Sequence, residues 1–360
     1  MKKILKPLSI LAFAAAMSSC GGAEAGKTPA EMLKDRISGM IADGQTMFGH
    51  QDDLMYGHTW RTDGGDFTRS DVREVCGFYP AVYGLDLGGI ELANETNLDK
   101  NPFAQMRASA VAHHERGGIV TFSWHPRNPL TGGDAWDVSS DKVVASILEG
   151  GEKHACFIGW LSNAADFLES LKTAGGELIP VIFRPWHEHT GSWFWWGRGL
   201  CTPEEYKALW KMTWEYMTVE RGLDNLVWSF SPGSGGLTEE IFMERWPGDE
   251  MVDMIGTDCY HYGTSEEYTA ELRNALDILV KFGAEHGKTI ALTETGCEGI
   301  PDAEWWTGTL APAIKGYPLS YVLTWRNAPD MPGHFYAPFP GQASAEDFRT
   351  FIESEKIRML

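Results

Sequence analysis

The stretch ELIPVIFRPWHEHTGSWFWWG, residues 177–197, contains the pattern that decides the fold. Most of its first half is an uninterrupted apolar run. Such a run, unlike an alternating one, indicates a strand buried on both faces of a parallel sheet. Where the run ends, Glu188 stands between His187 and His189, and four aromatic residues follow at positions 193–196. We therefore expect a buried strand whose carboxyl end presents a carboxylic acid among aromatic rings.

Similar apolar runs occur along the whole chain and alternate with segments of helical spacing. The expected strands lie at residues 46–53, 78–89, 119–129, 178–189, 225–232, 251–263, 288–296 and 318–329. The expected helices lie mainly at residues 28–42, 66–77, 101–118, 203–220, 265–287, 303–316 and 344–356. Eight units of strand and helix predict an α/β fold, the (β/α)8 TIM barrel. No linker follows residue 27, so we expect residues 28–360 to form a single domain.

The amino terminus has the composition of a targeting segment. Three lysines precede the mostly apolar run Leu8–Met17, which is too short to span a bilayer. The small residues before Cys20 resemble a bacterial lipoprotein processing site. We expect residues 1–19 to be a signal peptide, Cys20 to be lipidated and residues 20–27 to be a flexible tether. The protein would then be a lipoprotein in the periplasm or on the outer-membrane surface, or secreted if it is not lipidated.

The charge balance and the cysteines exclude several classes of partner. Thirty Lys and Arg against fifty Asp and Glu give a formal net charge of −20, whereas nucleic acids and anionic membranes attract basic proteins. Five cysteines follow Cys20 with no CxxC pair, which argues against a disulfide framework or a zinc site. A zincin motif needs His at positions i and i+4, but residue 191 is Gly. We expect a monomer without a cofactor or metal ion, held to the membrane only by its lipid.

Polar and aromatic residues gather where the expected strands end. In a barrel of this kind the catalytic groups lie at the carboxyl ends of the strands. The residues at these ends are His50, Gln51, Asp86, Trp124, His125, Asn128, Arg184, His187, Glu188, Ser229, Ser231, Asp258, Tyr260, His261, Glu294, Trp325 and Arg326. Glu188 and Glu294 follow the fourth and seventh strands, which face each other across a barrel. Most glycoside hydrolases use two carboxyl groups, and aromatic rings suit the flat face of a pyranose. The pattern predicts a sugar-cleaving enzyme.

Several of these segments resemble glycoside hydrolase family 26 of clan A, whose members are mostly β-mannanases. RPWHEHTGSWFWWG resembles the acid/base segment, and ALTETG resembles the nucleophile segment. VDMIGTDCY, SWHPRNP and TWRNA resemble three other strand-end segments, so the resemblance covers residues from about 40 to 330. It implies a retaining enzyme that cleaves β-1,4-mannosidic linkages in β-mannan or manno-oligosaccharides by double displacement.

The resemblance also implies a role for each matching position. Glu188 would be the acid/base and Glu294 the nucleophile, with Tyr260 hydrogen-bonded to Glu294. The implied substrate-binding and supporting residues are His125 and His187 at the sugar before the cut, Trp193 at the sugar after it, Trp325 beneath the reacting ring, Arg326 at a more distal sugar, and Asp253 and Asp258 beside the site. We also include Trp124, the neighbour of His125, among the substrate-binding residues. Trp195, Trp196 and His189 are better explained by packing. Asp253 could instead cap a helix or form a salt bridge, and His50 and His58 stay undecided.

Several alternatives stay open at this point. Family 26 also contains enzymes that act on β-1,3-1,4-glucan or β-1,3-xylan. A mannanase could cut the chain internally, or it could release mannobiose from one end if a loop closes the site; residues 87–101, 130–137 or 330–341 could form such a wall. A carbohydrate-binding lipoprotein without activity would keep the aromatic residues but would not need both glutamates.

Overall fold

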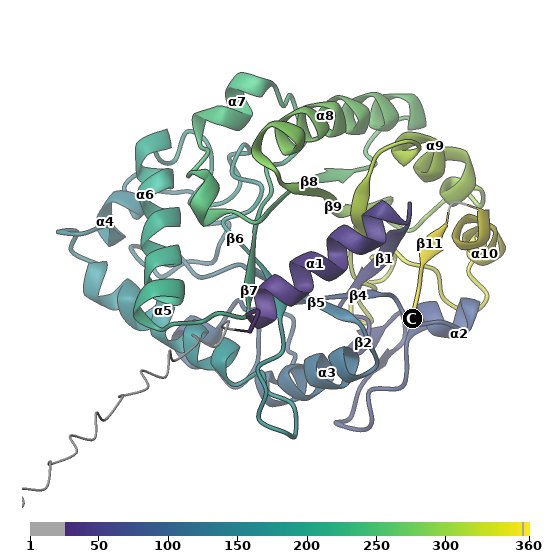
Figure 1. The fold of residues 1–360 in the computed structure, drawn as a ribbon, viewed down its shortest axis with the longest axis horizontal. Coiled ribbons are helices and arrows are strands. Elements are labelled where there is room, and N and C mark those ends of the chain that lie inside the picture. The colour runs from purple at the N-terminus through teal and green to yellow at the C-terminus, as the bar shows by residue number, and fades with distance from the viewer. Residues whose placement is uncertain (1–25, 355) are drawn as a thin grey trace, which may run out of the picture.

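The computed structural model describes residues 26–354 and 356–360. The expected signal peptide and Cys20 lie outside the described residues. Eight parallel strands pair in chain order, and the last pairs with the first, so the sheet closes into a barrel (Figure 1). These strands are β1 (Thr46–Gln51), β4 (Val82–Asp86), β5 (Ile119–Trp124), β6 (Val181–Pro185), β7 (Leu226–Phe230), β8 (Met254–Tyr260), β9 (Thr289–Gly296) and β10 (Leu319–Thr324). The prediction of a single-domain (β/α)8 barrel is confirmed.

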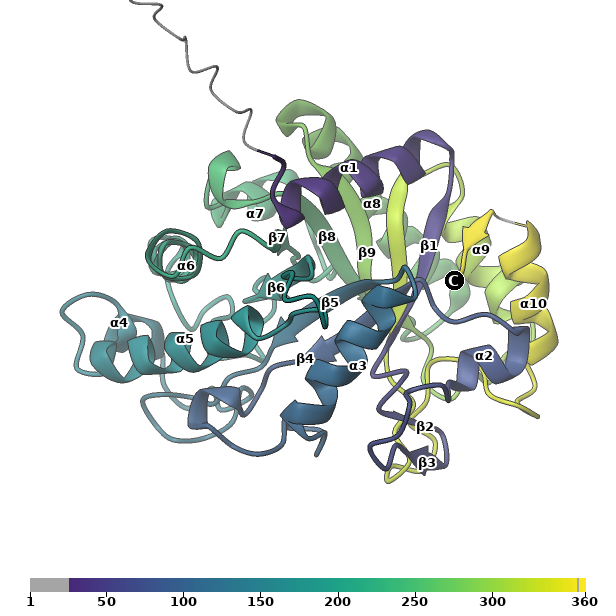
Figure 2. The same cartoon turned by 60° about the horizontal axis from the view of Figure 1, so that its bottom comes forward.

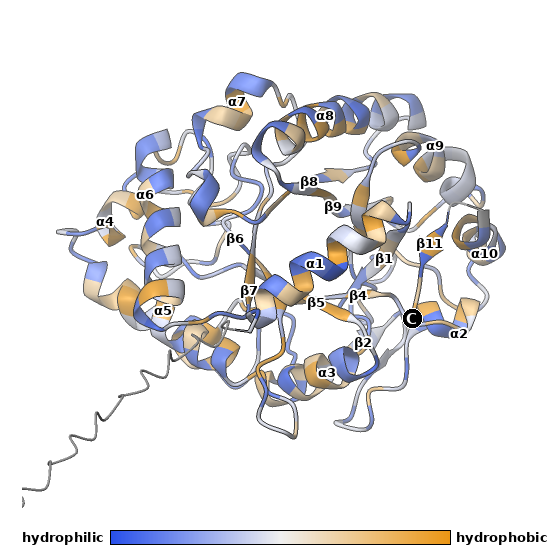
Figure 3. Ribbon diagram, in the orientation of Figure 1, coloured by the Kyte–Doolittle hydropathy of each residue, from blue (hydrophilic) through white to orange (hydrophobic). Residues whose placement is uncertain are grey.

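Helices cover the outside of the barrel and one of its ends. They are α1 (Pro29–Ala42), α2 (Asp71–Cys76), α3 (Phe103–Glu115), α4 (Val143–Ile147), α5 (His154–Glu169), α6 (Pro203–Trp214), α7 (Glu239–Glu244), α8 (Ser265–His286), α9 (Ala311–Ile314) and α10 (Ala345–Ser354). The barrel strands carry apolar residues, while the helices alternate apolar and polar ones (Figure 3). This is expected where strands are covered on both faces and helices on one. Within the described residues no helix combines the length and apolarity needed to cross a bilayer.

Helix α1 closes one end of the barrel, where the strands begin. Its buried residues Ala30, Leu33 and Ile37 belong to a cluster with residues at the strand starts, such as Met47 and Met254. Figure 2 shows α1 at this end and a short hairpin, β2 (Tyr56–Gly57) with β3 (Trp60–Arg61), at the opposite end. The carboxyl ends of the strands therefore face the open end, which is where a barrel of this type carries its chemistry.

Some local expectations were wrong. The helix expected from residue 66 begins only at Asp71, because the Ser70 side chain accepts a hydrogen bond from the Arg73 backbone N–H and caps the helix there. Phe67 has a φ of 51°, which a helix cannot include. The hairpin β2–β3 and strand β11 (Ile357–Arg358), which pairs with the start of β1, were not expected. Strands of two residues are too short to show a periodic pattern.

Candidate active site

A strained turn after β6 aims Glu188 at the open end of the barrel. Trp186 and Glu188 have φ values of 54° and 51°, in the left-handed region that non-glycine residues rarely adopt. The Tyr206 hydroxyl and the Trp196 indole N–H each donate, at 2.9 Å, to the carbonyls of the two residues before Glu188. The backbone N–H of Glu188 donates to the Ser231 carbonyl at 2.8 Å. Such strain costs about 1–3 kcal/mol for each residue, and it persists only where the surroundings fix the conformation.

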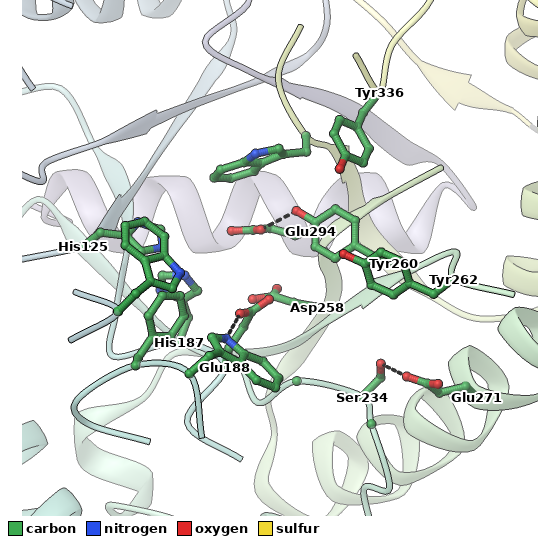
Figure 4. A pocket seen from close by; sticks show the side chains of 16 residues that line it. His125, His187, Glu188, Ser234, Asp258, Tyr260, Tyr262, Glu271, Glu294 and Tyr336 are labelled. Carbon is green, nitrogen blue, oxygen red and sulfur yellow. Dashed lines mark hydrogen bonds between the residues drawn. The ribbon is translucent and has the colours of Figure 1, made fainter. Parts of the chain in front are cut away.

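Glu188 opens into a pocket of about 530 Å³ that contains the reacting groups expected from the sequence (Figure 4). The lining residues are His125, Trp136, His187, Glu188, Trp193, Phe194, Gly233, Ser234, Gly235, Asp258, Tyr260, Tyr262, Glu271, Glu294, Trp325 and Tyr336. The two glutamates therefore share one pocket at the carboxyl ends of β6 and β9, as the prediction required.

Glu188 has the electrostatic properties of a proton donor. Burial and the neighbouring Glu294 carboxylate raise its pKa to about 7, because both disfavour a negative charge. The indole N–H of Trp193 donates to Oε2 of Glu188 at 2.6 Å and acts in the opposite direction. Glu188 is therefore protonated in a large fraction of molecules at neutral pH.

Glu294 is held in a different environment. Its side chain is buried, and both carboxylate oxygens accept hydrogen bonds: Oε1 from the Arg184 guanidinium, and Oε2 from the Tyr260 hydroxyl at 2.6 Å. One of these donors carries a fixed positive charge, and charge-assisted hydrogen bonds are among the strongest in proteins. The two glutamates thus differ in environment, as an acid and a nucleophile must.

Arg184 joins Glu294 to a second carboxylate. Its Nη1 lies 2.8 Å from Oδ2 of Asp258, while its Nη2 binds Glu294. Burial alone would lower the pKa of Arg184, but the two carboxylates outweigh it and the pKa is raised. Ligand atoms of His187, Asp258 and Glu294 lie within 4.8 Å of one another, yet the guanidinium already binds both carboxylates. This donor set therefore does not suit a metal ion.

Two histidines on one side of the pocket differ in charge preference. Burial lowers the pKa of His125, but Asp86, whose Oδ2 lies 2.7 Å from His125 Nδ1, outweighs burial, and the pKa is raised. Burial, followed by the Arg184 charge, lowers the pKa of His187 well below its usual value. The rings meet edge to face with centroids 4.5 Å apart. On this side of the pocket, His125 therefore favours the protonated form and His187 favours the neutral form.

Most residues expected at the site do line the pocket, but some do not. Trp124 is fully buried, and its indole N–H donates to Glu91 at 3.2 Å, so the prediction that it contacts substrate is wrong. Asp253 lies at the opposite end, where it accepts from the Trp228 N–H and forms a salt bridge with Lys34, so the salt-bridge alternative is right and the supporting role is wrong. The sequence pattern could not show that both side chains point away from the pocket.

Arg326 lies beside the pocket rather than in its lining. Its Nη1 pairs with Oδ1 of Asp99 at 2.6 Å and lies 3.3 Å from the Tyr56 hydroxyl. Trp195 and Trp196 are fully buried, in agreement with their expected packing role. His189 is also buried, with ring centroids 4.5 Å from Tyr206 and 4.6 Å from Phe230. His50 contacts Asp53, and the His58 ring stacks on Phe339 with centroids 3.7 Å apart, so neither lines the pocket.

Several lining residues were not expected from the sequence. Trp136 stacks on His125 with centroids 5.2 Å apart, and Tyr336 closes another side. Both belong to loops that the sequence offers as possible walls at one end of the site, namely residues 130–137 and 330–341. Residues 87–101, the third such loop, contribute nothing to the lining. Glu271 lies within helix α8, where reading the strand ends could not detect it.

Comparisons with known proteins agree with this geometry. The family model described as Glycosyl hydrolase family 26 matches residues 31–307. A mannan endo-1,4-β-mannosidase from Bacillus subtilis strain 168 is 33% identical over 272 residues, which are 71% of this chain and 68% of that protein. One from Bifidobacterium adolescentis is 32% identical over 335 residues, 85% of this chain but only 33% of that longer protein.

Solved structures give the same result. A GH26 β-mannanase from Bacteroides ovatus superposes with a TM-score of 0.89 and 51% identity, covering 92% of this chain and 95% of that one. A double mutant of the Cellulomonas fimi endo-β-1,4-mannanase superposes with a TM-score of 0.82 and 34% identity, covering 92% and 75%. The family model spans well over half of the sequence, and the resemblance expected from the motifs is confirmed. The chain therefore belongs to glycosyl hydrolase family 26.

Proposed function

We propose that this protein is a retaining β-mannanase that cleaves β-1,4-mannosidic linkages by double displacement. The observation that carries the proposal is the pair of glutamates in one pocket, one with its pKa raised to about 7 and the other bound by Arg184 and Tyr260. The substrate follows from the relatives, which are named as mannan endo-1,4-β-mannosidases. The proposed catalytic residues are Glu188 and Glu294.

In the first step Glu188 donates its proton to the glycosidic oxygen while Glu294 attacks the anomeric carbon. The bond from that carbon to the leaving oxygen breaks, and a covalent glycosyl-enzyme forms on Glu294. Tyr260 and Arg184 hold the attacking carboxylate in a fixed orientation. Because the donors are in place before the reaction, little reorganisation is needed as charge moves.

In the second step a water molecule replaces the leaving group and Glu188 takes its proton. The ester on Glu294 carries no negative charge, so the neighbouring anion that raised the pKa of Glu188 is gone. Glu188 then loses its proton more readily and can act as a base. The same side chain thus serves as acid and base in turn, as the retaining mechanism requires.

The side chains around the glutamates suit a sugar on each side of the cut. His125, His187 and Trp325 line the part of the pocket proposed to hold the reacting sugar. Trp193, which is 46% exposed, offers a stacking face for the sugar after the cut. Aromatic faces and a few placed polar groups are typical of sugar sites. Arg326 is proposed to reach a more distal sugar on the side before the cut.

We propose internal attack on the chain, which the relatives' names state for those proteins. A product time course on linear mannan and mannohexaose tests this, because internal attack gives a spread of product lengths and end attack gives mannobiose from the start. Proton NMR of the first products should show the β-anomer. Activity on lichenan or β-1,3-xylan without activity on mannan would replace the proposed substrate.

We also propose that the mature protein is a lipoprotein acylated at Cys20, with residues 28–360 as one monomeric catalytic domain. The basic, apolar and small-residue pattern before Cys20 supports this. Mass spectrometry of the membrane fraction should find a lipid on Cys20, and Cys20→Ala should release the protein from that fraction. An unmodified residue 20 in the mature protein would contradict the proposal.

A further inference from the structure

The pocket continues past Glu188 on the side away from His125. Figure 4 shows Ser234 and Glu271 there, with Tyr262 nearby. All three line the pocket, and none has a part in the two reaction steps. They come from the segment after β7, from helix α8 and from the segment after β8.

The backbone at Gly233 and Gly235 forms the floor of this part of the pocket, and it is hydrogen-bonded to the segment that follows Glu188. Thr190 lies two residues after Glu188, and its hydroxyl donates to the Gly233 carbonyl at 3.0 Å. A Cβ added to Gly233 would lie 3.8 Å from the Trp193 indole, so that ring stands directly beside the floor. A Cβ at Gly235 would meet only open space. The floor is therefore bare backbone next to a stacking ring, which leaves room for a flat ligand.

Glu271 provides a fixed acceptor at the edge of this floor. Its Oε1 accepts from the Ser234 hydroxyl at 2.5 Å, and Ser234 is itself buried and held by its N–H, which donates to the Asp258 carbonyl at 3.0 Å. Among the described residues no hydrogen bond uses Oε2 of Glu271. One oxygen thus orients the carboxylate while the other stays free for a ligand. Tyr262, which is 74% exposed, adds a second aromatic face at the rim.

We infer that Glu271, oriented by Ser234, and Tyr262 bind the leaving part of the substrate, one sugar unit beyond the unit that stacks on Trp193. The ligand is a neutral, hydroxyl-rich hexopyranose, because a carboxylate accepts hydrogen bonds from sugar hydroxyls and repels uronic acids. The side follows from the proposed mechanism: Glu188 gives its proton to the leaving oxygen, and His125, on the other side of Glu188, lines the part of the pocket proposed to hold the sugar before the cut (Figure 4). This inference rests on the proposed function.

The test measures how mannotetraose is positioned during hydrolysis. In water labelled with ¹⁸O the label enters the new reducing end, so mass spectrometry separates cuts that release two leaving units from cuts that release one. Glu271→Ala should lower the ratio of two-unit to one-unit cuts about tenfold, because a hydrogen bond to a charged group is lost. Glu271→Gln keeps an acceptor oxygen and should lower the ratio less. The control is Glu285→Ala, an exposed glutamate on the same helix outside the pocket.

The possible outcomes distinguish a role of Glu271 in substrate binding from a purely structural role. An unchanged ratio in Glu271→Ala would overturn the inference, and so would a lower total rate at an unchanged ratio, which indicates a structural role. Glu271 is exposed, so the variant should fold, and circular dichroism checks this. If the unaltered protein cleaves neither mannotetraose nor mannan, the proposed function fails. If it cleaves both and only the ratio test fails, this inference alone is lost.

Discussion

The indole N–H of Trp193 donates to Oε2 of Glu188 at 2.6 Å, so the ring proposed to hold the sugar after the cut is hydrogen-bonded to the proposed acid. Burial and Glu294 raise the pKa of Glu188 to about 7, and this hydrogen bond opposes them. Trp193 therefore has two separable properties, an aromatic face for the sugar and an N–H that adjusts the acid.

Trp193→Phe should separate these properties, because it keeps an aromatic face and removes the N–H. Without the donor the pKa of Glu188 rises further, so the descending limb of kcat/KM against pH should move to higher pH. The measurement is a pH profile on a manno-oligosaccharide, with Trp136→Phe as the control, since Trp136 makes no hydrogen bond to Glu188 among the described residues. A descending limb at the same pH in Trp193→Phe would show that the hydrogen bond does not adjust the acid.

Glu294→Ala should fold and lose hydrolysis of β-1,4-mannan by a factor on the order of 10⁴, since the double displacement would lack its proposed nucleophile. It should also lower the pKa of Glu188, because the adjacent anion is removed. Carbon-13 NMR of labelled glutamate can follow that titration directly. Full activity in this variant would refute the nucleophile assignment. A Glu188 pKa that stays near 7 would show that burial alone sets it.

The barrel was predictable because its signal is repeated. Each strand contains a short apolar run, and eight such runs leave little choice of fold. The meeting of Glu188 and Glu294 in one pocket was predictable for a related reason, since both residues lie at the ends of such runs. The direction of a side chain was not predictable. Trp124 ends β5 as His125 begins the next segment, but Trp124 packs between Phe157 and Trp186, and only the closed sheet decides which neighbour faces the pocket.

The pocket residues that come from a loop and from a helix were also not predictable from the sequence. Trp136 reaches His125 from a loop whose course depends on tertiary hydrogen bonds, such as the one from the Trp195 N–H to the Ala135 carbonyl at 3.1 Å. Glu271 reaches the pocket from α8 only because the Ser234 segment lies beside that helix. Neither contact produces a periodic pattern in the sequence, and neither residue lies at the end of a strand. The sequence therefore could not predict them.

Glu188→Gln should stabilise the folded protein, and more so at high pH. The folded pKa is about 7 and lies above the ordinary value of 4.5, so between these pH values the folded state holds a proton that the unfolded chain has lost. Stability therefore falls as pH rises through this window, and the neutral amide removes that loss. The melting temperature of Glu188→Gln should exceed that of the unaltered protein by about 2 °C or more at pH 8. At pH 4 the difference should be close to zero, and a constant difference would contradict the argument.

Arg184→Met should be the most destabilising of these changes. Arg184 is 3% exposed and its guanidinium is paired with Asp258 and Glu294, so its loss leaves two buried carboxylates without a cation. Removing one partner from a buried ion pair costs about 3–5 kcal/mol. Urea unfolding at pH 7 measures the loss. The matched control is Arg221→Met, whose exposed partners Asp166 and Glu169 should make the loss about 1 kcal/mol or less.

A double variant tests whether charge is the cause. Adding Asp258→Asn to Arg184→Met removes one of the two unpaired carboxylates, so it should restore part of the lost stability. The single change Asp258→Asn should cost less than Arg184→Met, because Arg184 keeps Glu294 as a partner. If the double variant is less stable than Arg184→Met, the loss comes from packing around the guanidinium stem. The ion pair would then not be what holds Glu294 in place.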